Sequence, residues 1–211
     1  MKKGFLAAGV VLLLTLAIPL QAAAKVDFGL GIKGGVCRLN VKSDFPSWPE
    51  KSGLTPTFGI FAVVNLGPTF ALQPELDYVR MGYVWWDYYL SVGKFVETYN
   101  YLQVPVLFKA RLVRGGKIIP VVSAGPVLGI LLSARVKIYD IDGVLAHEGD
   151  IKDLYRSVDL GAAFGAGVDI LSGKLTFIVD VRYYLGLMDT DVSPDFAAKT
   201  AGLMVTGGIG F

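Results

Sequence analysis

One pattern constrains this chain more than any other: in eight separate segments, large apolar residues alternate with small or polar ones. Successive side chains of a β-strand point to opposite faces, so the alternation predicts strands with two different surroundings. Every second residue is apolar or small in the following eight ranges: Val26–Ile32, Phe58–Val64, Phe70–Tyr78, Leu102–Ala110, Val122–Leu132, Leu160–Val168, Leu175–Leu185 and Leu203–Phe211. No charged residue belongs to any of these sets.

The opposite face of the same segments carries charges among many glycines. We predict that seven charged residues form a network inside the barrel: Lys33, Glu75, Asp77, Lys109, Asp159, Asp180 and Arg182. A charge on a lipid-facing strand position costs about 2–4 kcal/mol at the bilayer centre, so the charge-free face belongs in lipid. A soluble barrel has the reverse polarity and would leave this face in water. The pattern predicts an all-β, eight-stranded, antiparallel up-and-down transmembrane β-barrel.

The predicted connections alternate between short and long. Short links span residues 65–69, 113–117 and 171–174, and long links span about 41–54, 82–98, 133–156 and 189–199. This alternation is typical of outer-membrane barrels, which have short periplasmic turns and long extracellular loops, and it predicts that both termini are periplasmic. The apolar run Ile118–Ala134 contains Pro120 and Pro126, so we interpret it as a strand rather than a transmembrane helix.

The first 24 residues have the features of a Sec signal peptide. Lys2 and Lys3 precede the apolar stretch Phe5–Leu20, and Ala22-Ala23-Ala24 provides an A-x-A cleavage pattern. We predict export to the outer membrane of a Gram-negative bacterium, with residues 25–211 as the barrel domain. Cleavage removes two of the 20 basic residues and none of the 18 acidic ones, which leaves a formal charge of zero. A neutral chain gives no reason to expect a nucleic-acid partner.

The terminal aromatic residue Phe211 ends an alternating last strand. This ending is similar to the signal that the barrel-assembly machinery reads. We therefore predict that machinery as a partner during biogenesis and outer-membrane lipid as the permanent surroundings.

Several short motifs, in order along the chain, resemble the PorT-like outer-membrane β-barrel family. They are Gly31-Ile32-Lys33-Gly34-Gly35-Val36, Gln73-Pro74-Glu75-Leu76-Asp77-Tyr78, Tyr101-Leu102-Gln103-Val104-Pro105-Val106-Leu107, Ala124-Gly125-Pro126, and Asp159-Leu160-Gly161 with Gly165-Ala166-Gly167. The resemblance covers essentially the whole mature chain. It implies a small barrel of the OmpX or OmpA type, and it implies no single activity.

The interior charges allow two interpretations. They can form a proton or ion path, or a paired network that fills a lumen too narrow for a channel. Eight strands leave just enough room for side chains, which favours the second interpretation. We expect Glu75 to pair with Lys109, and Asp180 and Arg182 to lie near Lys33 and Asp159.

Other motifs carry weaker functional signals. Gly29-Leu30-Gly31-Ile32-Lys33-Gly34 matches a dinucleotide-binding pattern but lies within a strand, where glycines make room for large interior neighbours. His147 is the only histidine and lies in an acidic long loop, where it is either catalytic or simply solvated. Asp140-Ile141-Asp142-Gly143 fits a hairpin turn better than a calcium loop. We expect no metal and no cofactor.

Aromatic residues gather around the second long link. They are Tyr83, Trp85, Trp86, Tyr88, Tyr89, Tyr99 and Tyr101. Such rings settle at the membrane interface as a girdle, or they provide a stacking surface for a glycan or a partner protein. Trp85, Trp86, Tyr88 and Tyr89 are the candidate interaction surface.

The sequence as a whole favours a barrel with a structural or partner-binding role and no enzymatic activity. The alternatives are a narrow solute pore and an outer-leaflet enzyme that acts on lipid or peptide.

Overall fold

The computed structural model describes residues 28–43, 51–86, 93–113, 115–190 and 198–211. Within these ranges eight strands are long: β1 (Phe28–Ser43), β3 (Thr55–Asn65), β4 (Phe70–Trp86), β5 (Lys94–Arg111), β6 (Ile118–Tyr139), β8 (Val158–Ser172), β9 (Leu175–Gly186) and β10 (Ala198–Gly210). Two short strands, β2 (Lys51–Ser52) and β7 (Leu145–Asp150), and the 3-10 helix η2 (Lys152–Leu154) complete the elements. The signal peptide predicted for residues 1–24 lies outside the described residues.

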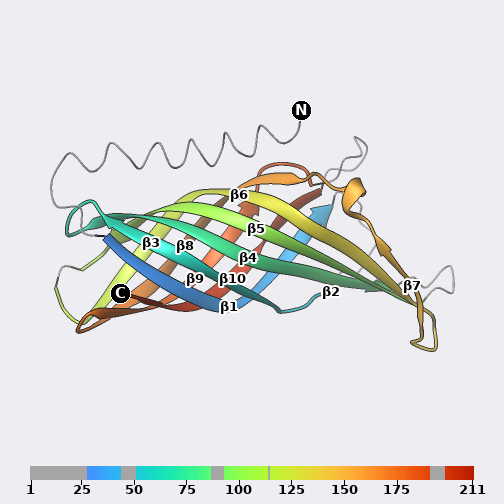
Figure 1. Ribbon diagram of the computed structural model, residues 1–211, viewed down its shortest axis with the longest axis horizontal. Coiled ribbons are helices and arrows are strands. Elements are labelled where there is room, and N and C mark those ends of the chain that lie inside the picture. The colour runs from blue at the N-terminus through green and yellow to red at the C-terminus, as the bar shows by residue number, and fades with distance from the viewer. Residues whose placement is uncertain (1–27, 44–50, 87–92, 114, 191–197) are drawn as a thin grey trace.

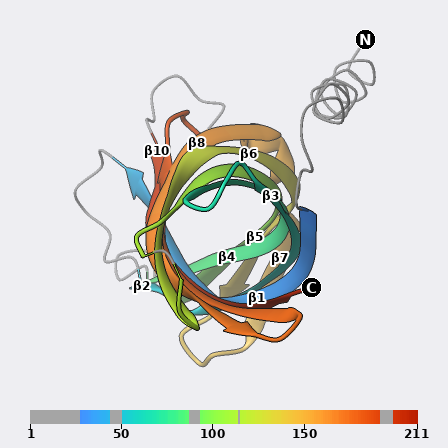
Figure 2. The same cartoon turned by 90° about the vertical axis from the view of Figure 1, so that its left-hand side faces the viewer.

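The eight long strands close into one antiparallel barrel (Figures 1 and 2). Each pairs with its neighbours along the chain, β10 pairs with β1, and β4 and β5 complete the ring. Closure gives every long strand a partner on both sides, which satisfies the backbone hydrogen bonds that lipid cannot satisfy. The predicted fold class and strand count are confirmed. In the described ranges, no helix is long and apolar enough to cross a membrane.

The two faces of the strands have the predicted polarity. The apolar sets point outwards; Ile60 of β3, for example, is 56% exposed and lies between Ile32 of β1 and Leu76 of β4. Aromatic pairs reinforce this outer surface, with Phe58 stacked on Tyr78 at 4.9 Å between ring centroids. The alternate residues are buried inside the barrel.

The strands are longer than predicted. Two of the predicted loops, residues 82–98 and 133–156, are therefore wrong, because β4, β5 and β6 extend into them. β8 pairs with β6 only as far as Ile130, yet β6 continues to Tyr139 between β5 and β7. β4 and β5 likewise run on together as far as Trp86 and Lys94. This sheet of β4, β5, β6 and β7, which we call the projecting sheet, extends beyond the closed barrel (Figure 1). Charged residues such as Glu97, Arg135 and Lys137 occur in these strand ends, so the charge-free apolar alternation does not mark them in the sequence.

The predicted hairpin at Asp142-Gly143 is confirmed. It joins β6 to β7, with Ile138 opposite His147. The carboxylate of Asp140 accepts the backbone N–H groups of Asp142 at 3.0 Å and Val144 at 2.8 Å, and Gly143 has a φ of 79°. The left-handed backbone explains the glycine, and the carboxylate closes the turn.

The outward face can be tested by replacing Ile60 with lysine. We expect Ile60→Lys to lower the free energy of unfolding in lipid vesicles by about 2–4 kcal/mol, because it places a charge in the middle of a lipid-facing strand. Urea titration gives this value. The control is Leu54→Lys, at a side chain that is 72% exposed just before β3; this change should have an effect within about 0.5 kcal/mol. Equal losses in the two variants would contradict a lipid-facing position for Ile60.

Candidate functional site

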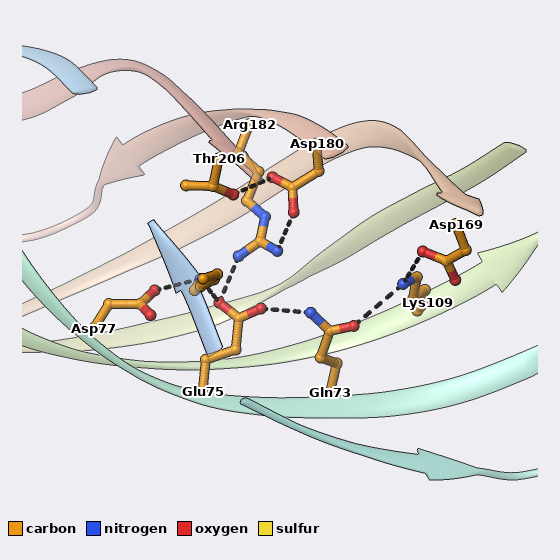
Figure 3. Close-up of polar contacts among 9 residues, drawn as sticks. Gln73, Glu75, Asp77, Lys109, Asp169, Asp180, Arg182 and Thr206 are labelled. Carbon is orange, nitrogen blue, oxygen red and sulfur yellow. Dashed lines mark hydrogen bonds and ion pairs between the residues drawn. The ribbon is translucent and has the colours of Figure 1, made fainter. Parts of the chain in front are cut away.

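The interior of the barrel contains a continuous set of polar side chains, which we call the polar network. Its nine members come from β1, β4, β5, β8, β9 and β10, and Figure 3 shows them: Lys33, Gln73, Glu75, Asp77, Lys109, Asp169, Asp180, Arg182 and Thr206. All nine are buried. Because buried charges are costly unless they are paired, their partners decide how stable this arrangement is.

Glu75 of β4 lies at the centre of the polar network and is only 4% exposed. Its Oε2 atom is 2.5 Å from Nζ of Lys33 on β1 and 2.5 Å from Nη1 of Arg182 on β9. Its other oxygen, Oε1, accepts a hydrogen bond of 2.7 Å from Nε2 of Gln73. One carboxylate therefore joins two cations from strands far apart in the sequence.

The network spreads from this centre in two directions. On one side, Arg182 also contacts Asp180 at 2.5 Å, and Thr206 donates a 3.2 Å hydrogen bond to Asp180. Lys33 also contacts Asp77 at 2.7 Å.

On the other side, Gln73 extends the network to a second ion pair. Nζ of Lys109 lies 3.3 Å from Oε1 of Gln73 and 2.7 Å from Oδ1 of Asp169. The three cations of the network thus each contact at least one carboxylate. Charge-assisted contacts of this kind are the strong ones in proteins, and here they cross-link opposite walls of the barrel.

Glycines on neighbouring strands make room for the network. Gly59 lies opposite Asp77, and a Cβ atom on Gly59 would come within 2.1 Å of the Asp77 carboxylate. Gly165 lies opposite Arg182, where an added Cβ would be 2.8 Å from Cγ of the arginine. The glycines on the inward face are therefore the spatial counterpart of the large charged residues.

Six of the seven charged residues predicted for the interior network lie in it: Lys33, Glu75, Asp77, Lys109, Asp180 and Arg182. The predicted pairing of Glu75 with Lys109 is wrong. Lys109 lies opposite Ala71, four residues before Glu75 in β4. Four residues of a strand span about 13 Å, so Gln73 has to bridge the two.

Asp159 lies apart from the network, which corrects the expectation that it lies near Lys33 and Arg182. It is the second residue of β8, opposite Gly129 of β6, and it accepts a 2.8 Å hydrogen bond from the hydroxyl group of Tyr184. Lys33 and Arg182 lie in the polar network instead, bound to Glu75.

Gln73, Asp169 and Thr206 are network members that the sequence analysis did not single out as network residues. Asp169 has the same parity as Asp159, and the predicted strand ends one residue before it. If the predicted strand had continued by one residue, it would have included Asp169 on the inward face. Gln73 and Thr206 carry no charge, and only the structure shows that they connect charged groups.

The tyrosines predicted at the membrane interface lie inside the barrel instead. Tyr83, Tyr99 and Tyr101 are buried, and the rings of Tyr83 and Tyr99 stack at 5.3 Å. The hydroxyl of Tyr99 contacts Glu97 and lies 2.6 Å from that of Tyr155. The reason is parity: Tyr83 has the same inward parity in β4 as Glu75. Tyr88 and Tyr89 lie outside the described residues, as do the side chains of Trp85 and Trp86.

These tyrosines belong to an apolar cluster, which we call the apolar plug. It is formed by Cys37, Leu39, Val79, Met81, Tyr83, Tyr99, Tyr101, Leu107, Val127, Leu131, Ala134, Ala163, Tyr184 and Met204. Ile151 and Tyr155, which flank η2, pack against it. The interior therefore combines a charged layer with an apolar one.

Comparison with known proteins identifies the family. Residues 21–192 match the family described as outer membrane protein beta-barrel domain. The chain belongs to this family. Membership implies a location in a bacterial outer membrane. A comparison with curated proteins finds no match.

Solved structures with the same fold include several small outer-membrane barrels. The outer membrane protein OprG from Pseudomonas aeruginosa is 12% identical, with a TM-score of 0.50 over 89% of this chain and 98% of that one. Ail, the attachment invasion locus protein of Yersinia pestis, was solved with the heparin analogue sucrose octasulfate and is 14% identical, with a TM-score of 0.47 over 88% and 99%. The outer membrane enzyme PagL is 13% identical, with a TM-score of 0.44 over 84% and 97%. At these identities the likeness concerns the fold alone.

In this outer-membrane barrel the polar network leaves little free space. A gap of about 10 Å³ lies among Gln73, Lys109, Asp180 and Arg182, which is about enough for one water molecule. In the described ranges, no group of three or more His, Cys, Asp or Glu residues is suited to a metal ion. The arrangement is chemically suited to bracing the barrel walls.

The bracing role can be tested at Arg182. Arg182→Gln leaves Glu75 with one cation and Asp180 with none, so we expect the free energy of unfolding in lipid vesicles to fall by about 3–5 kcal/mol. The matched control is Arg135→Gln, because the Arg135 side chain is 65% exposed and lies 3.9 Å from Glu148. Exposed pairs contribute at most about 1 kcal/mol. Similar losses at both positions would show that the buried network does not brace the barrel.

Proposed function

We propose that this protein is a non-enzymatic outer-membrane barrel that anchors the projecting sheet as a binding surface for a partner protein. The observation that carries the proposal is the extension of β4, β5, β6 and β7 beyond the closed barrel (Figure 1). A barrel that only spans the membrane has no need for this extra length. Strands of this length place a binding edge away from the lipid surface.

The edge of the projecting sheet suits recognition by strand addition. Among the described residues, β7 pairs with β6 alone, so its other edge offers backbone N–H and C=O groups. Such an edge is a template for an extended segment of another protein. The hairpin beside it exposes apolar side chains: Ile141 is 75% exposed, and Val144 and Leu145 are exposed as well. Apolar residues at a loop tip favour contact with a partner over a purely solvated role.

The interior supports an anchoring role rather than a pore. An eight-stranded barrel is just wide enough for its own side chains, and here these are the polar network and the apolar plug. Both consist of buried residues that contact one another across the lumen.

The surroundings of His147 support a role without catalysis. It is an exposed residue of β7. The nearby Asp140 carboxylate accepts two backbone N–H groups of the turn. A catalytic histidine needs a partner that orients it, and Asp140 is engaged in a structural role instead.

The proposal includes a route to the membrane and an orientation in it. The signal sequence in residues 1–24 directs export of a Gram-negative protein, and Phe211 provides the assembly signal. The short turns and both termini lie in the periplasm, and the projecting sheet lies outside the cell. The motifs in β1, β4, β5, β6 and β8 support assignment to the PorT-like outer-membrane barrels, and this assignment carries no single activity over to this chain.

The partner-binding surface can be tested by crosslinking in native outer membranes. A photoreactive amino acid at Val144 should give a discrete crosslinked protein, identified by mass spectrometry. The double change Ile141→Asn and Leu145→Asn should abolish this product, because it removes apolar contact area beside the edge of β7. Leu112→Asn is the matched control, since Leu112 is equally apolar and exposed but follows the end of β5 that lies away from the projecting sheet. A barrel that gives no crosslink, or one insensitive to the double change, would rule out this surface.

The pore alternative makes a separate prediction. The purified protein in planar lipid bilayers should give no steady single-channel conductance, because the polar network and the apolar plug occupy the lumen. Regular conductance steps that Arg182→Gln alters would replace the anchoring proposal with a pore.

A further inference from the structure

A cavity of about 230 Å³ lies at the short-turn end of the barrel. Figure 2 views the molecule from this end, where β1 and β10 meet near the C-terminal residue. The floor of the cavity includes Lys109 and Asp169, the outermost ion pair of the polar network. Unlike the gap deeper in the lumen, this space is large enough for more than a single water molecule.

The lining of the cavity has an excess of positive charge. Lys109, Arg111 and Lys174 provide three cations. Two anions face them: Asp169, which Lys109 already contacts at 2.7 Å, and the C-terminal carboxylate of Phe211, which also lines this space. Arg111 donates one hydrogen bond of 2.7 Å to Asn65. A guanidinium group has five N–H donors, so Arg111 keeps others that can face a ligand. Lys174 lies exposed in the turn between β8 and β9.

The remaining wall of the cavity is partly apolar. Phe61 and Ile178 face the lumen and are buried, and both line this space. The volume exceeds the roughly 150 Å³ of a cavity that accepts a benzene ring, and it is below the range of about 300–1,000 Å³ for larger ligands. Size and lining together suit a small molecule with one anionic group and one apolar group.

We propose that this cavity binds a small carboxylate that carries a short apolar tail, with Arg111 and Lys174 holding the carboxylate and Phe61 and Ile178 contacting the tail. Two sources share this chemistry: a free small organic acid, and the C-terminus of a peptide that ends in an apolar residue. A planar guanidinium matches the two oxygens of a carboxylate. The site is independent of the projecting sheet and lies at the opposite end of the molecule (Figure 1).

The experiment uses the full barrel in lipid nanodiscs and follows backbone amide NMR signals as probes are added. The probes are 3-phenylpropionate for a free acid, N-acetyl-phenylalanine for a peptide C-terminus, and neutral 3-phenylpropanamide as the uncharged control. We expect saturable shifts from at least one carboxylate, centred on residues that line the cavity. The Arg111→Gln and Lys174→Gln double variant should weaken this affinity at least about tenfold.

Two further variants keep the result interpretable. Lys174→Gln alone changes an exposed turn residue and leaves the interior intact, so it should weaken binding in a barrel that is fully folded. Lys117→Gln is the matched control, because Lys117 is an exposed lysine of another short turn and does not line the cavity. This variant should bind the carboxylate probes with the same affinity as the unchanged protein.

The outcomes separate the possibilities. Binding of N-acetyl-phenylalanine alone would assign the site to peptide C-termini, and binding of 3-phenylpropionate alone would assign it to free acids. Equal binding of the neutral amide would overturn recognition of a carboxylate. Shifts that never saturate, or that persist unchanged in the double variant, would reflect partitioning into lipid and would overturn the site.

Discussion

The closed ring of backbone hydrogen bonds is the constraint on which the rest of the structure depends. In lipid, an unpaired N–H or C=O group costs several kcal/mol, so the sheet has to close upon itself. The pairing of β10 with β1 and of β4 with β5 achieves this closure. Once the ring is closed, alternation divides every strand into a lipid face and a lumen face, and charges in the middle of the strands, such as Glu75 and Arg182, lie in the lumen.

Confinement in the lumen explains why the charges form one connected network. Lys33 and Arg182 reach the same oxygen of Glu75 from different strands, and Gln73 links that centre to Lys109 and Asp169. Large side chains fit there because glycines stand opposite several of them, as at Gly59 and Gly165. A large side chain on one strand packs over a glycine on the neighbouring strand. The ion pair between Glu75 of β4 and Arg182 of β9 links opposite walls of the barrel.

Because the polar network and the apolar plug occupy the lumen, the surfaces that can bind a partner or ligand lie at the two ends of the barrel. At one end β6 and β7 continue past the membrane-spanning ring and expose a strand edge. At the other end the outermost ion pair borders a cavity with further cations. The polar network and the apolar plug lie between these two surfaces, which we propose bind a partner protein and a small carboxylate.

The sequence by itself determined the strand count, the closure and the lumen or lipid face of the residues in the eight alternating segments, because parity along a strand is a local property. It also located the hairpin at Asp142-Gly143. The pairing of charges required the tertiary structure: which inward residues share a level depends on the stagger between strands, and this stagger sets Lys109 opposite Ala71 and brings Arg182 to Glu75. The tertiary structure was also needed to show that Tyr99 points inwards and that the projecting sheet exists. Backbone pairing holds those strand ends together, and charged residues such as Arg135 and Lys137 interrupt the apolar alternation there.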